Sequence, residues 1–168
     1  MSERIDATQS ETAPFQPSAA HEALAAMVGQ WRGPTKTWLD PSAPPDESIT
    51  EATVEPLLGC RWIRIDYRGR VLGKLHAGQM IVGFHKDAQE HEIAWLDSFH
   101  TGTAMMFSIG KASGDGSVSV LGSYAAGPER WGWRTGLRMD DGRLVLEAWN
   151  ITPDGQEFPA IETRLARR

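Results

Sequence analysis

The chain has 168 residues, a formal net charge of −5 and one cysteine, Cys60. This length suits one domain with a core of its own, and a single cysteine excludes a disulfide framework or a cysteine metal cluster. The 17 Lys and Arg residues are scattered, and no apolar run approaches the roughly 20 residues of a membrane-spanning helix, so neither nucleic acid nor membrane is an expected partner.

The N-terminal part divides into a polar tail and a short helix. Residues 1–17 are rich in Ser, Thr, Gln, Glu and Pro, so we predict a disordered tail there, followed by a single domain over residues 18–168. Ser18 suits the N-cap of a helix over Ala19–Val28, and Gly29 suits its end. The tail lacks the apolar stretch of a signal peptide, which makes a cytoplasmic location the expectation.

The rest of the chain shows alternating, strand-like runs separated by regularly spaced turns. Turns containing Asp-Gly, such as Asp141-Gly142 and Asp154-Gly155, supply the positive φ that tight hairpins need. Successive hairpins form an antiparallel meander, which hides its edges by closing on itself. We therefore predict an all-β fold: a closed antiparallel up-and-down barrel of about ten strands, with the helix over one end. Strands are expected at residues 30–39, 49–57, 60–68, 78–85, 91–98, 103–110, 117–124, 131–139, 143–151 and 157–166.

Two irregular segments interrupt the meander. Asp40–Ser48 contains three prolines, and Arg68–Ala77 contains two glycines and His76. Long loops on a tight meander usually lie at an open mouth, so these two segments are the predicted portal.

Charged residues lie among the aromatic positions of several strands, which favours a polar-lined cavity over a solid core. The seven tryptophans are expected mainly to fill the interior, and some of them to contact a ligand. The expected partner is a small hydrophobic or aromatic molecule. The predicted ligand-binding residues are Trp62, Arg64, Trp95, Met105, Trp133, Arg134 and Trp149.

Three residues are candidates for acid/base chemistry: Asp97, His100 and Glu147. Asp97 shares a strand face with Trp95, where burial would raise the pKa of the carboxyl. The structural alternative is that Asp97 bonds Arg134 or a backbone N–H. His100 is the preferred histidine, since it follows a strand end at the rim, and no metal site is predicted because the histidine spacings match no ligand pattern.

The sequence also resembles known families. Gly29-x-Trp31 after a short helix resembles the start of lipocalin-like (calycin) barrels, and this implies that Trp31 closes one end against Arg167 or Arg164. Residues from about 21 to 168 resemble the bacterial domain of unknown function 1579 family, with His85 and Cys60 as departures from its pattern. The motifs carrying the resemblance are Leu24-x-x-x-Val28-Gly29-x-Trp31, Leu58-Gly59-x-Arg61, Gly78 to Gly83-Phe84, Trp95-x-Asp97-Ser98, Arg134, Asp154-Gly155-x-Glu157, Glu162 and Arg167.

The resemblance implies small-ligand binding and no settled activity, and no cofactor is predicted. Some related small barrels, the nitrobindins, hold haem through a histidine late in the chain, but no histidine follows His100 here. Three functions therefore remain open: a ligand-binding barrel, a cofactor-free isomerase, cyclase or hydrolase in the same cavity, and a homodimeric interaction module formed through a wall bearing Trp131 or Trp133.

Overall fold

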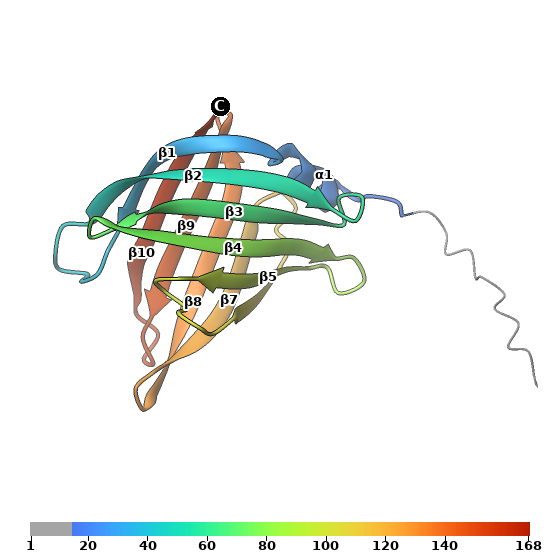
Figure 1. Ribbon diagram of the computed structural model, residues 1–168. Coiled ribbons are helices and arrows are strands. Elements are labelled where there is room, and N and C mark those ends of the chain that lie inside the picture. Colours follow the sequence, from blue (N-terminus) through green and yellow to red (C-terminus); the bar gives the residue numbers. More distant parts are fainter. Residues whose placement is uncertain (1–14) are drawn as a thin grey trace, which may run out of the picture.

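One short helix and ten strands make up the computed structural model, which describes residues 15–168. Each strand pairs antiparallel with the next, and β1 also pairs with β10, so the barrel is closed (Figure 1). This confirms the predicted fold class. The elements are α1 (Ala19–Ala26), β1 (Gly29–Thr37), β2 (Asp46–Leu57), β3 (Trp62–Val71), β4 (Lys74–His85), β5 (Glu90–Asp97), β6 (Met106–Lys111), β7 (Val118–Ala126), β8 (Glu129–Asp140), β9 (Arg143–Ile151) and β10 (Glu157–Arg167). In the predicted tail, residues 1–14 lie outside the described residues.

Alternation along the strands decides which side chains form the core. In β5, buried and half-buried residues alternate without a break, and in β3 Ile63 and Ile65 are buried while Arg64 between them is not. Successive side chains of a strand point to opposite faces, so one set fills the barrel and the other meets solvent.

The helix lies at one end of the barrel (Figure 1). The start of β1 and the end of β10 pair with each other there. The helix buries Leu24 and Met27, and the Trp31 indole N–H donates to the Met27 carbonyl at 2.8 Å. Arg167 lies over the Trp31 ring at 4.3 Å and donates to the Val28 carbonyl at 2.8 Å. Of the two arginines that the resemblance allowed, Arg167 therefore takes this place. No helix in the described part of the chain is long and apolar enough to cross a membrane.

The predicted irregular segment Arg68–Ala77 is wrong. Strand β3 continues to Val71 and β4 begins at Lys74, so only Leu72 and Gly73 form the turn. Both have positive φ, 51° and 74°, which is the backbone of a two-residue hairpin turn. Leucine gives no sequence signal for that conformation, and the hairpin was missed for this reason. The long segments on this side of the barrel are residues 38–45 between β1 and β2, close to the predicted loop Asp40–Ser48, and residues 98–105 between β5 and β6.

His91 is an unusual core residue near the helix end. Its side chain is buried, and neither ring nitrogen has a hydrogen-bond partner among the described residues. Its ring packs on the Phe84 ring, and the Phe84 ring also makes an edge-to-face contact with the His21 ring. Burial lowers the pKa of His91, and the proximity of His21 lowers it further. His91 is therefore neutral in the folded protein at neutral pH.

We expect His91→Leu to weaken the acid sensitivity of the fold. The pKa of His91 is lower in the folded chain than the roughly 6.5 of an unfolded one, so the stabilisation is fully present above that pH and is lost as the pH falls below it. Removing two unpaired ring nitrogens should also raise the free energy of unfolding at pH 7 by about 1 kcal/mol. Urea unfolding at pH 7.5, 6.5 and 5.5 measures both effects, with the exposed His85→Gln as the matched control. An unchanged loss of stability between these pH values would contradict the assignment.

Candidate functional site

The barrel encloses a cavity of about 50 Å³. By a comparable measure a water molecule needs about 10–15 Å³, and a cavity of about 150 Å³ binds benzene. The cavity therefore has room for about three waters or for one molecule of a few non-hydrogen atoms. Its wall surface is mainly apolar, with Leu137, Leu144 and Leu146 among the lining residues. The described residues that line it include no Lys, Arg, Ser or Cys.

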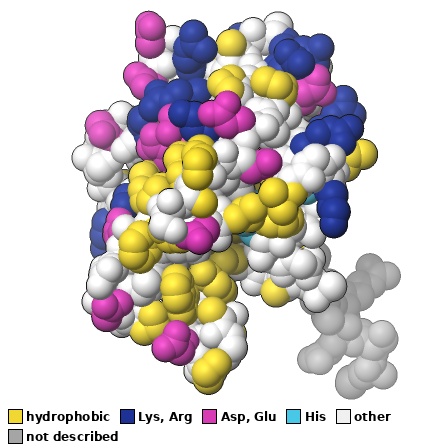
Figure 2. Space-filling model, turned by 90° about the vertical axis from the view of Figure 1, so that its left-hand side faces the viewer, with side chains coloured by type: hydrophobic (Ala, Val, Ile, Leu, Met, Phe, Trp, Pro, Cys, Tyr) yellow, Lys and Arg dark blue, Asp and Glu magenta, His cyan; other side chains and the backbone are white. Residues whose placement is uncertain are grey.

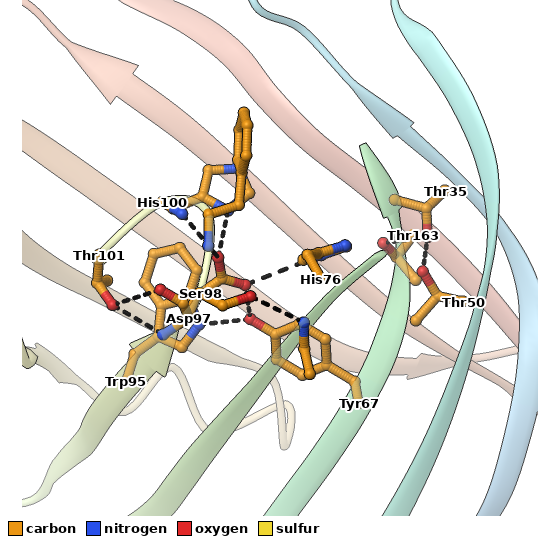
Figure 3. Close-up of polar contacts among 12 residues, drawn as sticks. Thr35, Thr50, Tyr67, His76, Trp95, Asp97, Ser98, His100, Thr101 and Thr163 are labelled. Atoms are coloured by element: carbon orange, nitrogen blue, oxygen red, sulfur yellow. Dashed lines mark hydrogen bonds and ion pairs between the residues drawn. The ribbon is translucent and has the colours of Figure 1, made fainter. Parts of the chain in front are cut away.

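Asp97 is the most completely surrounded polar group of the cavity (Figure 3). It ends β5, and the chain turns back over its carboxylate, so the backbone N–H groups of Phe99 and His100 both donate to Oδ1 at 2.7 Å. The His100 Nδ1 lies 3.1 Å from the same oxygen, and the Tyr67 hydroxyl donates to Oδ2. The Thr101 hydroxyl accepts the Asp97 backbone N–H at 2.7 Å and fixes the loop.

These donors keep the carboxylate charged inside the barrel. Burial by itself would raise the pKa of Asp97, but hydrogen bonds from His100 and Tyr67 outweigh it and hold the pKa well below its usual range. For Tyr67 burial and the Asp97 charge act together and raise the pKa of the phenol far above its usual range. Tyr67 therefore stays a hydrogen-bond donor, and it accepts the Trp95 indole N–H at 2.7 Å.

His76 projects from β4 into the same cavity, and its side chain is 9% exposed. Its Nε2 lies 3.9 Å from Asp97 Oδ2, beyond hydrogen-bond distance, and its Nδ1 has no hydrogen-bond partner among the described residues. Burial lowers the pKa of His76, the Asp97 charge opposes this, and His100 lowers it further. A neutral imidazole has one donor and one acceptor, so His76 retains unused capacity for both.

Three threonines form a second polar group in the cavity. The Thr35 hydroxyl donates to Thr50 at 2.7 Å and lies 2.9 Å from the hydroxyl of Thr163. All three are buried and line the cavity, as does Thr37. In Figure 3 His76 lies between the Asp97 group and these threonines.

Strand β5, which ends at Asp97, ends on the side of the barrel opposite α1 (Figure 1). Exposed apolar side chains lie there on the segments between strands and at the start of β4: Leu39, Leu72, Leu75, Phe99 and Met105. Figure 2 shows this side, with hydrophobic groups over its middle and lower parts and Lys and Arg mainly above. An apolar rim of this kind suits the approach of an apolar molecule.

Of the residues predicted from the sequence, Trp95, Asp97 and His100 line the cavity together. Trp133 is buried and stacks on Trp95 with ring centroids 5.2 Å apart, so it supports the wall from behind. Of the two structural partners expected for Asp97, the backbone N–H is observed, from Phe99 and His100, whereas Arg134 does not reach the carboxylate and pairs with Glu157.

Six other predicted residues do not line the cavity, and their placement there is corrected. Trp62 covers Gly83, Arg64 pairs with Glu55 and Asp66, and Met105 is 63% exposed. They lie on the outer face or in a loop because Ile63 and Ile65, the neighbours of Arg64, take the inward positions of β3.

The remaining three predicted residues, Arg134, Glu147 and Trp149, lie on β8 and β9. They also point away from the cavity because neighbouring residues of their strands take the inward positions. Arg134 lies over the Trp149 ring at 4.0 Å, and Glu147 pairs with Arg138 at 2.6 Å. The hydrogen bond from Arg138 lowers the pKa of Glu147, against the effect of its partial burial. Thr135 and Ala148 take the inward positions beside them. Glu147 is thus part of an outer ion-pair ladder and is not placed for acid/base chemistry in the cavity.

Sequence reasoning missed Tyr67, His76 and the threonines as site residues. His76 falls in the segment expected to be a loop, and threonine is so common in strands that its presence carries no signal. Alternation gave one clue: Tyr67 shares its strand face with Ile63 and Ile65, which are core residues.

Comparisons with known proteins agree with this architecture. The chain is similar in structure to Rv2717c from M. tuberculosis, whose crystal structure matches with a TM-score of 0.63 and 15% identity over 91% of this chain and 99% of that one. At this identity the likeness shows the fold alone. No curated protein matches the sequence. The model of the family described as "Protein of unknown function (DUF1579)" matches residues 16–167. The chain therefore belongs to the DUF1579 family, as its motifs predicted.

Proposed function

We propose that the protein binds a small, mainly apolar molecule with a polar group in its central cavity, with the polar group directed at Asp97 and His76. One observation carries the proposal: a mainly apolar cavity retains a charged carboxylate and an imidazole with unused hydrogen-bonding capacity. Buried polar groups are normally satisfied, so unused capacity at a cavity wall indicates a place for water or a ligand.

The apolar wall would supply most of the affinity and the polar groups the orientation, as in other ligand cavities. The volume restricts the ligand to a few non-hydrogen atoms unless the wall moves. The apolar rim would bring such a molecule to the mouth.

A catalytic function in the same cavity receives less support. Asp97 suits a fixed, charged anchor better than a proton carrier, because its pKa lies far below neutral pH and Oδ1 already accepts three hydrogen bonds. His100 remains the acid/base candidate, positioned by Asp97 through Nδ1. Among the described residues, those lining the cavity include no serine or cysteine nucleophile.

Filling the cavity should abolish binding. Ala52 is buried and lines the cavity, so Ala52→Leu places three additional carbon atoms in the space. We expect binding of small apolar alcohols, followed by tryptophan fluorescence because Trp95 lines the cavity, to weaken at least tenfold. Ala94→Leu, on the outer face of β5, is the matched control and should bind as the wild type does. Equal titrations of wild type and Ala52→Leu, or none for the wild type, would overturn the proposal.

A further inference from the structure

We propose that the cavity selects an uncharged, compact molecule that presents a hydrogen-bond acceptor to the threonines and a donor to Asp97, as a primary amide or a hydroxyketone does. This inference rests on the proposed function and adds the chemistry of the ligand.

The threonine end must supply a hydrogen. Three hydroxyls have three hydrogens, but their two mutual hydrogen bonds use only two. With Thr35 donating to Thr50 and accepting from Thr163, the remaining hydrogen belongs to Thr50. Reversing the direction moves it to Thr163. In either case one buried hydroxyl at the cavity wall has a hydrogen to donate, and an acceptor on a ligand satisfies it.

The Asp97 end must accept a hydrogen. Oδ1 receives three donors, whereas Oδ2 receives the Tyr67 hydroxyl alone within hydrogen-bond distance. A carboxylate oxygen accepts at least two hydrogen bonds. The His76 Nε2 lies 3.9 Å away, beyond hydrogen-bond distance, so among the described residues the second acceptor site of Oδ2 has no donor. A ligand N–H or O–H fits this position.

Gly69 allows Thr50 and His76 to pack close to the backbone of β3. A Cβ at Gly69 would lie 3.0 Å from Thr50 Oγ1 and 3.2 Å from His76 Cε1, closer than ordinary van der Waals contact. Its φ is not in the left-handed region, so the backbone does not require glycine here. The missing Cβ is therefore best explained by the positions that it allows the Thr50 hydroxyl and the His76 ring to take on the cavity wall.

Charge excludes the ionic alternatives. An anion would meet the Asp97 carboxylate in a cavity whose described lining holds no Lys or Arg, and the low dielectric of the interior strengthens that repulsion. A cation with donors only would attract Asp97 but would leave the threonine hydrogen without an acceptor. A neutral molecule with both groups satisfies both ends.

Four molecules of nearly identical planar shape test this directly. Acetamide carries a donor and an acceptor, acetone an acceptor only, acetate is an anion, and acetamidinium is a cation with donors only. Saturation-transfer NMR on their methyl groups, with the Trp95 indole N–H shift as the protein signal, gives each Kd. We expect a roughly millimolar Kd for acetamide, as suits four non-hydrogen atoms, and at least tenfold weaker binding for the other three.

The outcomes separate the two proposals. Binding of none of the four would overturn the proposed function, and this inference with it. Binding of acetone, acetate or acetamidinium as tightly as acetamide would overturn this inference while leaving a ligand-binding cavity in place.

Variants of two residues test where acetamide binds in the cavity. Thr50→Val keeps the shape and removes a hydroxyl, and should weaken acetamide binding about five- to tenfold. Thr53→Val, on the outer face of the same strand, should leave it unchanged. Gly69→Ala should weaken all binding because the added Cβ displaces Thr50 and His76, with circular dichroism to verify the fold. Full acetamide affinity in both Thr50→Val and Gly69→Ala would overturn the placement.

Discussion

Replacing Asp97 by asparagine is expected to lower the free energy of unfolding at pH 7 by about 2–4 kcal/mol. The isosteric amide has one acceptor oxygen in place of two and no charge. Whichever way it turns, its NH2 group faces donors: either the backbone N–H groups of Phe99 and His100 or the Tyr67 hydroxyl. Urea unfolding followed by tryptophan fluorescence measures the change.

The pH dependence gives a second signature of the same carboxylate. Because the pKa of Asp97 is lowered in the fold, its stabilisation is fully present above the unfolded value of about 3.9 and is lost as the pH falls below it. The difference between wild type and Asp97→Asn should therefore be constant from pH 7 to 5 and shrink in more acidic solution.

Asp66→Asn is the matched control for Asp97. Asp66 accepts from Arg64 at 2.7 Å on the outer face, where ion pairs contribute about 0–1 kcal/mol. A loss of less than 1 kcal/mol for Asp97→Asn, or an equal loss for both variants, would show that the buried carboxylate does not anchor the site.

Trp31→Ala is expected to cost about 3–5 kcal/mol of unfolding free energy, the range for removing a large aromatic side chain from a core. The Trp31 side chain is fully buried, its indole N–H donates to the carbonyl of Met27, and Arg167 covers its ring. The variant therefore leaves a cavity, an unpaired carbonyl and an arginine without its aromatic partner where both ends of the domain meet.

Trp131→Ala is the control, since Trp131 is partly exposed on β8 and its indole N–H bonds, within residues 15–168, to Glu129 alone. It should cost less than about 1 kcal/mol. The intermediate Trp31→Phe keeps most of the ring and loses the hydrogen bond, so about 1–2 kcal/mol is expected. Comparable urea midpoints for Trp31→Ala and Trp131→Ala would contradict the role of Trp31 in closing the barrel.

The candidate site was only partly predictable, and the reason differs from residue to residue. Asp97 and His100 were found because a carboxylate and an imidazole near a strand end are unusual, whereas Arg134 and Glu147 looked equally suitable and lie outside. In β9 polar groups lie on both faces, so alternation did not show there which face is internal. In β8 alternation already placed Arg134 on the face opposite Trp133 and Leu137, which the structure buries. Ordinary residues such as Thr35 acquire a role only through their neighbours.

The meander, the short leading helix and the family are predictable from the amino-acid sequence alone. The signals for them, turn residues and alternation, depend only on residues that are close to one another along the chain. The closure of the barrel decided the rest. It brings Thr35 within 2.9 Å of Thr163, 128 positions later, and places β3, β4 and β5 so that Tyr67, His76 and Asp97 converge. Such contacts depend on strand register and on which face turns inward, and both are set by the packing of the whole barrel.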